Sequence, residues 1–325
     1  MRYTIFGESH GPAIGVTLEG VPSGVELDWD FIRSEMARRA PGQNAMSTAR
    51  RETDEPQVLS GVFENRTTGT PLCAVIQNTD TRSRDYSKLR DLPRPGHADY
   101  SGAVRYGGYN DYRGGGHFSG RLTAPMVFAG AVAKLILRQR GVEVTGRISN
   151  LAGIADPTPE QVEEAILAAK AEGDSVGGCI ACSVTGLAPG LGAPDFGCNV
   201  EGIFSQYLFA VPAVKGVAFG AGFGFAALRG SQANDPFYMD GDTVRTRTNH
   251  TGGVNGGITN GMPVEFEVVL RPTPSISRPQ QTVSLSRRED AELVIEGRHD
   301  PCVVVRALPV IEAAAALAAC EVMGI

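Results

Sequence analysis

The stretch formed by residues 122–140 constrains the fold more than any other part of this chain. It reads Leu-Thr-Ala-Pro-Met-Val-Phe-Ala-Gly-Ala-Val-Ala-Lys-Leu-Ile-Leu-Arg-Gln-Arg and is followed by Gly141. A helix that is apolar on most of its faces is stable only when other elements surround it. We therefore expect a largely buried helix that ends at this glycine, with much of the chain packed around it.

Three further helices are predicted, two from their end signals and one from its alanine content. Asp28 can cap a helix over residues 29–39, which would end near Pro41 and Gly42. Thr158 opens a capping box with proline at the first helical position, and that helix, amphipathic and exposed, would end at Gly173. An alanine-rich helix over about residues 310–323 is expected to pack against another element.

Strand-like runs lie between these helices, at residues 14–21, 71–77, 175–185, 214–228 and 262–270. Residues 264–268 read Val-Glu-Phe-Glu-Val, an alternation that indicates a sheet with one solvated face. Strands and helices do not alternate regularly along the chain, which disfavours a doubly wound parallel fold. One α+β domain over residues 1–325, with antiparallel sheets around buried helices, fits best.

The charge balance limits the partners. The net charge of −6 argues against a general nucleic-acid binder, which needs a basic surface. Only four of the 30 basic residues are lysines, so 26 are arginines. A biased genome composition explains much of such an excess, whereas bidentate binding of phosphate or carboxylate explains local clusters of arginine. The 41 glycines predict many tight turns or close approaches of backbone to a ligand.

The six cysteines and the N-terminus indicate a reducing, cytoplasmic setting. Cys179 and Cys182 form a lone Cys-x-x-Cys in a strand-like run, with no second pair at zinc-finger spacing. We interpret the cysteines as reduced core residues and predict no metal site. The N-terminus has no apolar signal core, and we expect no stretch that spans a bilayer.

All five histidines lie in short polar stretches that contain glycine or proline; they are His10, His97, His117, His250 and His299. Loops of this composition are where a rigid scaffold presents reactive groups, and imidazole is the usual proton-transfer group near neutral pH. Any one of these histidines is more simply a hydrogen-bonding surface residue. Together with nearby arginines, the five favour an acid–base site for a negatively charged substrate.

Four stretches resemble anion sites: residues 37–42 with 49–51, residues 94–97, residues 113–121 and residues 297–302. The third runs from Arg113 through three glycines to Arg121 and into the apolar helix, so its amides form a plausible phosphate cradle. It lacks the spacing of a P-loop or of a dinucleotide-binding motif. The glycine-rich residues 251–261 and the loop 271–277 suit a flat cofactor lying against backbone, or are simply tight turns.

Together these stretches resemble the chorismate synthase family over nearly the whole chain and in order. The motifs are residues 7–11, 68–71, 78–80, 94–100, 173–178, 189–192, 214–217, 230–232, 252–261 and 297–302. The resemblance implies a sandwich of antiparallel sheets around helices, assembled as a homotetramer. It also implies conversion of 5-enolpyruvylshikimate 3-phosphate to chorismate by 1,4-anti elimination of phosphate, with reduced FMN as cofactor.

Residue roles follow from the same resemblance. His10 is implied as the acid for the departing phosphate, His97 as the group that sets flavin protonation, and Asp300 as an aid to flavin N5. Substrate anions are implied to bind the arginines Arg39, Arg51, Arg94, Arg121 and Arg298. FMN contacts are implied for His117, Phe118, Ser119, Ala213, Gly256, Arg271, Pro272, Thr273, Pro274, Ser275 and Arg298. His250 and His299 are interpreted as structural neighbours of functional residues.

The chain departs from the common family pattern at two positions. His117 stands where many members have an arginine near the flavin, and we expect its imidazole still to meet FMN. Ala45 stands where many members have an arginine associated with anion or NADPH contacts. The alternative to an enzyme is a non-catalytic flavin- or phosphate-binding protein with the same fold. Mere binding, however, needs none of His10, His97 and Asp300.

Overall fold

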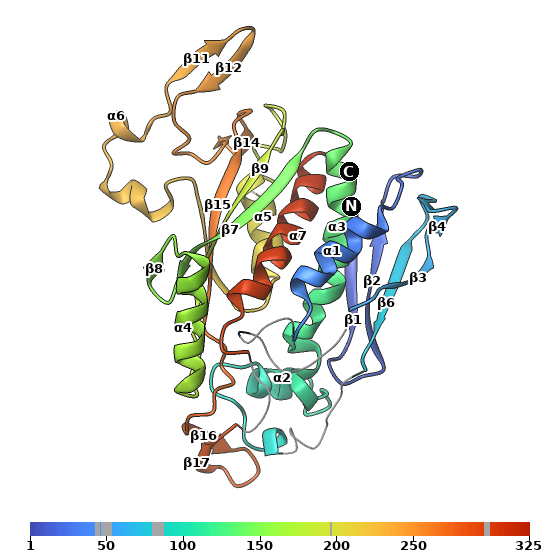
Figure 1. Cartoon of the computed structure of the whole chain (residues 1–325), viewed down its shortest axis with the longest axis vertical. Coiled ribbons are helices and arrows are strands. Elements are labelled where there is room, and N and C mark those ends of the chain that lie inside the picture. The colour runs from blue at the N-terminus through green and yellow to red at the C-terminus, as the bar shows by residue number, and fades with distance from the viewer. Residues whose placement is uncertain (43–45, 47–53, 80–87, 196, 296–299) are drawn as a thin grey trace.

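The computed structural model describes residues 1–42, 46, 54–79, 88–195, 197–295 and 300–325, and it has two antiparallel sheets with helices between them (Figure 1). The first sheet has the order β1 (Arg2–Gly7), β2 (Ala13–Glu19), β6 (Leu72–Gln77), β3 (Gln57–Ser60). The second has the order β10 (Val214–Phe219), β15 (Val264–Leu270), β9 (Gly178–Thr185), β7 (Glu143–Leu151), β8 (Ile154–Ala155). The predicted α+β class, with antiparallel sheets flanking buried helices, is confirmed.

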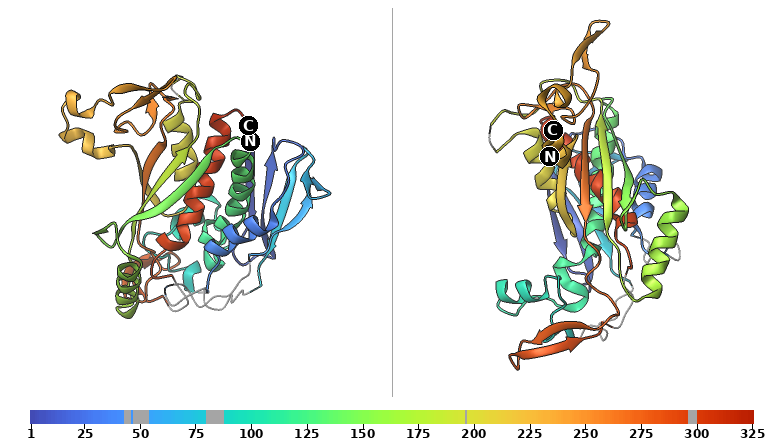
Figure 2. Two further views of the ribbon diagram at one scale, coloured as in Figure 1. Left: turned by 45° about the horizontal axis from the view of Figure 1, so that its top comes forward. Right: turned by 90° about the vertical axis from the view of Figure 1, so that its left-hand side faces the viewer.

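Two long helices fill the space between the sheets. Helix α3 (Thr123–Arg138) packs on β2 and β6 of the first sheet, and α7 (Val304–Val322) packs on β7 and β9 of the second. The two helices lie against each other, with α1 (Trp29–Arg39) and α5 (Val200–Phe209) beside them (Figure 2). The apolar stretch that we expect to be buried is therefore the centre of the molecule.

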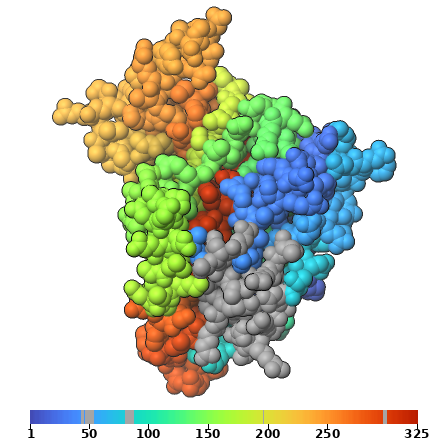
Figure 3. Space-filling view, viewed as in Figure 1, coloured from blue at the N-terminus to red at the C-terminus, as the bar shows by residue number. Residues whose placement is uncertain are grey.

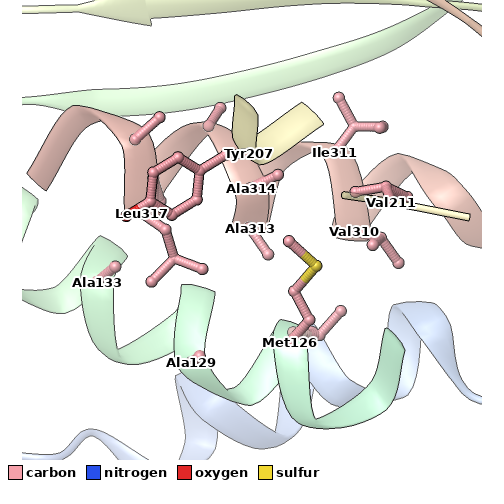
Figure 4. Close-up of a cluster of buried hydrophobic side chains, with 14 of the residues drawn as sticks. Met126, Ala129, Ala133, Tyr207, Val211, Val310, Ile311, Ala313, Ala314 and Leu317 are labelled. Atoms are coloured by element: carbon pink, nitrogen blue, oxygen red, sulfur yellow. The ribbon is translucent and has the colours of Figure 1, made fainter. Parts of the chain in front are cut away.

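Small residues let α3 and α7 approach closely. A Cβ placed on Gly130 of α3 would lie 2.2 Å from the Cβ of Ala313 on α7, so only glycine fits there. Figure 4 shows Met126, Ala129 and Ala133 of α3 facing the alanine-rich side of α7. The segment Arg113–Arg138 is long and apolar enough to cross a membrane by length and composition alone, but 89% of its most apolar stretch is buried within the protein, as in a core helix.

The helix-end signals are confirmed. Asp28 accepts a hydrogen bond from the Phe31 amide at the start of α1, and Thr158 forms the predicted capping box at the start of α4 (Pro159–Ala171). Helix α7 begins at Val304, earlier than predicted, because it accommodates Pro309 within its second turn. In β15 the buried and exposed side chains alternate as predicted.

Other elements differ from the prediction. The run 214–228 is a strand only as far as Phe219 and continues as a 3₁₀ helix over Gly222–Ala227. Strands β1 and β7 and helix α5 carry no strong periodic signal and were not predicted. The remaining elements are α2 (Asp99–Arg105), α6 (Gly230–Ala233), 3₁₀ turns at Arg113–Phe118 and Gly120–Leu122, and the hairpins β4 (Val62–Phe63)–β5 (Arg66–Thr67), β11 (Phe237–Asp240)–β12 (Thr243–Thr246), β13 (Val254–Asn255)–β14 (Ile258–Thr259) and β16 (Gln280–Ser284)–β17 (Glu289–Leu293).

The core draws on both sheets and all the helices between them, from Ile14 to Val322 in one apolar cluster. This cluster favours one domain over residues 1–325, which stays a prediction. All six cysteines are free thiols. The interpretation of the cysteines as core residues is wrong for Cys198, which is exposed, and holds fully only for Cys182, Cys302 and Cys320.

Candidate functional site

Two of the predicted catalytic histidines contact neighbouring residues of one glycine run. Gly114, Gly115 and Gly116 have φ values of 58°, 86° and 54°, a left-handed conformation that glycine adopts without strain. A Cβ on Gly114 would lie 2.3 Å from the ring of His10, and one on Gly115 would lie 3.0 Å from Cε1 of His97. The fold therefore brings His10 and His97 against adjacent residues of the same backbone segment.

The loop that carries His10 is fixed from both ends. The Ser9 amide donates to the Gly116 carbonyl at 3.1 Å, and Nδ1 of His10 lies 3.2 Å from the Ser9 hydroxyl. The side-chain amide of Asn78 donates to the carbonyls of Glu8 and Gly11, one on each side of His10. The His10 side chain is buried, with 8% of the residue exposed, so its surroundings are largely protein.

His97 is part of a charged triad within one turn. Its Nδ1 lies 2.7 Å from Oδ1 of Asp99, and this carboxylate accepts two hydrogen bonds from the Arg94 side chain, at 2.7 and 2.8 Å. An ionised carboxylate only accepts hydrogen bonds, so Asp99 favours a proton on Nδ1 of His97, while Nε2 lies 3.3 Å from Nη2 of Arg94. Burial alone would raise the pKa of Asp99, but hydrogen bonds from Arg94 and His97 outweigh it and lower that pKa well below 3.8.

The predicted cofactor loop 271–275 lies against this triad. Arg94 Nη1 donates to the Ser275 hydroxyl at 3.1 Å, and Nη1 of Arg271 donates to the Gly96 carbonyl. The Arg271 amide also donates to the carbonyl of Ala213, another predicted FMN residue, at 3.0 Å. The Thr273 hydroxyl is buried and has no hydrogen-bond partner among the described residues. An orphaned buried hydroxyl at this point suits a polar ligand.

Two predicted substrate arginines share one carboxylate. Arg39 and Arg121 are both almost fully buried, and the side chain of Asp54 bridges them: Oδ2 lies 2.5 Å from Nη1 of Arg39, and Oδ1 accepts from Nη1 of Arg121. Asp54 follows a stretch that lies outside the described residues, and no sequence motif singled it out. Arg121 Nε also donates to Asn78 Oδ1 at 3.1 Å, which joins this pair to the His10 loop.

Asp300 is held by an arginine that the sequence reasoning missed. Arg306, in the first turn of α7, donates Nη1 to the Asp300 carboxylate and Nε to the Arg39 carbonyl, the latter at 2.9 Å. Both side chains are mostly buried, with 19% and 14% exposed. The start of α7, the end of α1 and Asp300 are thereby tied together.

The turn at residues 117–119 lies next to the glycine run. Nδ1 of His117 donates to the Gly7 carbonyl at the end of β1, at 2.9 Å, and this imidazole is exposed. The ring of Phe118 packs against Gly102 of α2, and the Ser119 hydroxyl accepts from the Arg121 amide. The His117 imidazole is therefore accessible and is held at the end of β1.

Among the described residues, Gly256 is the one predicted FMN contact that lies away from the loop of residues 271–275. It lies in the β13–β14 turn, near the start of β15, whereas Arg271 follows the end of β15. A seven-residue strand is about 23 Å long at ~3.3 Å per residue, which separates the two. Four other predicted or noted residues, Ala45, Arg51, Arg298 and His299, lie outside the described residues.

His250 belongs to a different loop from the other described histidines, and its amide donates to Asp235 at 2.7 Å. The contact is with its backbone, as expected for a structural role.

Within the described parts of the chain, no group of three or more His, Cys, Asp and Glu side chains could hold a metal ion.

The fold brings buried arginines and two histidines to one region, residue types typical of an enzyme that acts on an anionic small molecule. The sequence model of the family described as chorismate synthase matches residues 1–323, and the chain belongs to that family. A chorismate synthase of Thermococcus kodakarensis is 47% identical over 335 residues, covering 97% of this chain and 94% of its own. One from Methanothermobacter thermautotrophicus is 44% identical, covering 97% and 90%.

The structural comparison agrees. A crystal structure of a chorismate synthase superimposes with a TM-score of 0.75 and 27% identity, covering 98% of this chain and 89% of that one. The protein is therefore a lyase of the shikimate pathway that converts 5-enolpyruvylshikimate 3-phosphate to chorismate and phosphate. The sequence motifs predict the same activity.

Proposed function

We propose that the residues around the glycine run divide the elimination of phosphate between them. His10, buried beside Ser9, donates the proton to the departing phosphate as general acid. Arg39, Arg94 and Arg121 hold the substrate's anionic groups with Arg51 and Arg298, because guanidinium matches phosphate and carboxylate geometry. The single observation that carries this proposal is the convergence of His10 and His97 on the adjacent glycines Gly114 and Gly115.

We propose that reduced FMN binds along the 271–275 loop, Ala213 and the 117–119 turn. When bound, reduced flavin supplies electron density to the reacting ring without net oxidation. Two features fit such a group: the orphaned hydroxyl of Thr273 and the cradle of glycine backbone at residues 114–116. His97, with its proton held on Nδ1 by Asp99, presents Nε2 as the group that exchanges a proton at the cofactor's edge. We assign Asp300, which pairs with Arg306, to the same site, together with Arg298.

Anaerobic incubation with substrate and chemically reduced FMN tests the assignment of His10. We expect the wild type to release phosphate and chorismate in equal amounts, and His10→Ala to turn over about 10²- to 10⁴-fold more slowly, the usual contribution of a general acid. His250→Ala is the matched control and should keep wild-type turnover. Full activity of His10→Ala with normal folding would remove His10 from the mechanism.

The substitution Thr273→Val tests the flavin site without measuring turnover. If the Thr273 hydroxyl binds FMN, the dissociation constant from flavin fluorescence rises about 3- to 10-fold, the loss of one hydrogen bond. If no group of FMN reaches this hydroxyl, valine leaves the flavin affinity unchanged and stabilises the protein, because a buried unpaired polar atom is removed.

We propose a homotetramer, for which the hairpin arm offers an apolar surface. The β11–β12 hairpin projects from the body (Figure 3), and Phe237, Met239 and Val244 on it are more than half exposed, as is Phe223 nearby. Exposed apolar patches of this kind mark association surfaces. In such an assembly Gly256 would reach a flavin only from a neighbouring copy. Sedimentation of Phe237→Ser with Met239→Ser should show smaller species than the wild type; an unchanged mass would exclude the arm as interface.

We propose a cytoplasmic location for this enzyme.

The source of the reduced flavin is a separate proposal. Ala45 replaces an arginine associated with NADPH contacts, so we expect NADPH alone not to bleach oxidised FMN anaerobically. Bleaching by the purified protein would show a built-in reductase and contradict this expectation.

A further inference from the structure

Asp54 occupies an unusual place for a carboxylate. Its side chain is fully buried, and its backbone has a φ of 53°, a left-handed conformation that few residues other than glycine, asparagine and aspartate adopt. The two oxygens of Asp54 contact different guanidinium groups, those of Arg39 and Arg121. Such a backbone conformation persists when the surrounding contacts require the side chain at that point.

Contacts lead from Asp54 to the His10 loop. Arg121 donates Nε to Asn78 Oδ1, and Asn78 donates to the carbonyls of Glu8 and Gly11 at 3.0 and 2.9 Å. The hydrogen bonds therefore run from the carboxylate, through one guanidinium and one amide, to both sides of His10. A shift of Arg121 moves the donor that orients the Asn78 side chain, and with it the loop.

Contacts also lead from Asp54 to Asp300. Arg39 pairs with Asp54 through its side chain and accepts from Arg306 through its backbone carbonyl. Arg306 in turn pairs with Asp300. Arg39 also donates to the Thr123 hydroxyl at 3.1 Å and to the Gly120 carbonyl at 3.1 Å, so its guanidinium orientation is set on three sides.

The chemistry of a carboxylate suits this central place. Two guanidinium groups near each other repel, and a carboxylate between them turns that repulsion into two charge-assisted hydrogen bonds. An ionised carboxylate only accepts hydrogen bonds, so Asp54 orients the donors of both arginines without competing for them as a donor. The guanidinium nitrogens of Arg39 and Arg121 that do not contact Asp54 are thereby held in fixed orientations.

We propose that Asp54 is a positioning residue that fixes the guanidinium groups of Arg39 and Arg121 for the substrate anion and, through Asn78, the loop of His10. The inference rests on the proposed function, in which these arginines bind substrate. Asp54 contacts neither substrate nor flavin in this role.

Two substitutions test it. Asp54→Asn keeps the shape and removes the charge, and Asp54→Gly removes the side chain at a φ that glycine tolerates. For both we expect kcat/KM for 5-enolpyruvylshikimate 3-phosphate to fall about 10- to 100-fold through a raised KM, since misplaced binding groups cost this much. The FMN dissociation constant should stay within about twofold. Formate should restore part of the activity of Asp54→Gly by refilling the carboxylate position, whereas chloride at equal ionic strength should not.

Matched variants separate the possible outcomes. Glu55→Gln removes the neighbouring acidic side chain, which is exposed and pairs with Arg33, and should leave kinetics unchanged. If Arg39→Ala leaves KM unchanged, the assignment of Arg39 to substrate binding fails. If Arg39→Ala raises KM but both Asp54 variants behave as wild type, only the role of Asp54 is overturned. Loss of FMN binding and thermal stability in step with activity, with no rescue by formate, also overturns it in favour of a purely structural carboxylate.

Discussion

Arg38 and Arg39 are neighbours at the end of α1, yet they belong to two different ion networks. Arg38 donates to both oxygens of Glu312 and to Glu35, and Lys134 joins the same two carboxylates from α3. Arg39 shares Asp54 with Arg121 and contacts a hydroxyl and a carbonyl near the start of α3. Successive residues of a helix point about 100° apart, so one arginine faces the α1–α3–α7 junction and the other faces the site.

The location of an arginine's hydrogen-bond partners distinguishes a structural arginine from a functional one. The partners of Arg38 lie on helices of the core, and Glu312 also accepts from the Gly146 amide of β7, so this network joins structural elements. The partners of Arg39 lie on turns that lead to His10 and Asp300. Buried ion networks therefore need to be traced to their ends before they are interpreted as stabilising or as functional.

The largest expected effect is on stability, in the Arg38 network. Glu312→Leu leaves Lys134 and Arg38 with less compensating charge in a buried place and should lower the free energy of unfolding by about 3 kcal/mol. Urea unfolding measures it, and Lys134→Met combined with Glu312→Leu should recover part of the loss. A loss below about 1 kcal/mol would show that the Arg38 network does not stabilise the junction.

The second prediction compares the catalytic activity of Arg39 and Arg38 variants. Arg39→Ala should lower kcat/KM by about 100-fold, equal to about 2.7 kcal/mol of transition-state stabilisation, whereas Arg38→Ala should lower it less than about fivefold. Steady-state kinetics at 25 °C, on protein shown to be folded, decides between them. Equal losses for both variants would contradict the division into a structural and a functional arginine.

The third prediction concerns the loss of stability at low pH. Burial alone would raise the pKa of Glu312 and Asp54, but Arg38 and Lys134 lower the first below 4.5, and Arg39 and Arg121 lower the second below 3.8. A lowered folded pKa gives stability that is complete above the ordinary value and is lost as the pH falls through the folded value. The melting temperature should fall more steeply for the wild type than for Glu312→Gln between about pH 5 and about pH 3. Parallel curves would contradict the contribution of Glu312.

The smallest effect belongs to a third arginine of α1. Arg33 is half exposed and pairs with Asp30 and Glu55 on the surface. Exposed pairs of this kind contribute little, so Arg33→Ala should change unfolding free energy by less than about 0.5 kcal/mol and leave kinetics unchanged. Urea titration of this variant sets the background against which the effects at Arg38 and Arg39 are read.

Sequence patterns predicted the parts of the fold that local chemistry dictates. The apolar run of α3, the caps at Asp28 and Thr158 and the alternation of β15 depend on neighbouring residues, and each is present. Helix α5 and strand β1 were missed because tertiary packing, more than local propensity, stabilises them.

The site shows the same limit. His10, His97 and the glycine run were found because each lies in a compact motif, and the resemblance to one family joined them. Asp99 could have been noticed two residues after His97, as a carboxylate placed to orient imidazole. Asp54 could not, because its partners Arg39 and Arg121 lie 15 and 67 residues away and only the fold brings them together. Arg306 follows its partner Asp300 by six residues, but its contact with the Arg39 carbonyl, 267 residues away, also depends on the fold.

The glycine run at residues 114–116 has one more consequence. Because the run has no side chains, the imidazoles of His10 and His97 lie directly against the backbone of Gly114 and Gly115. A side chain at Gly114 would displace His10, and one at Gly115 would displace His97. Even an alanine in this run would therefore disturb one of the two proposed proton carriers without touching either histidine in the sequence.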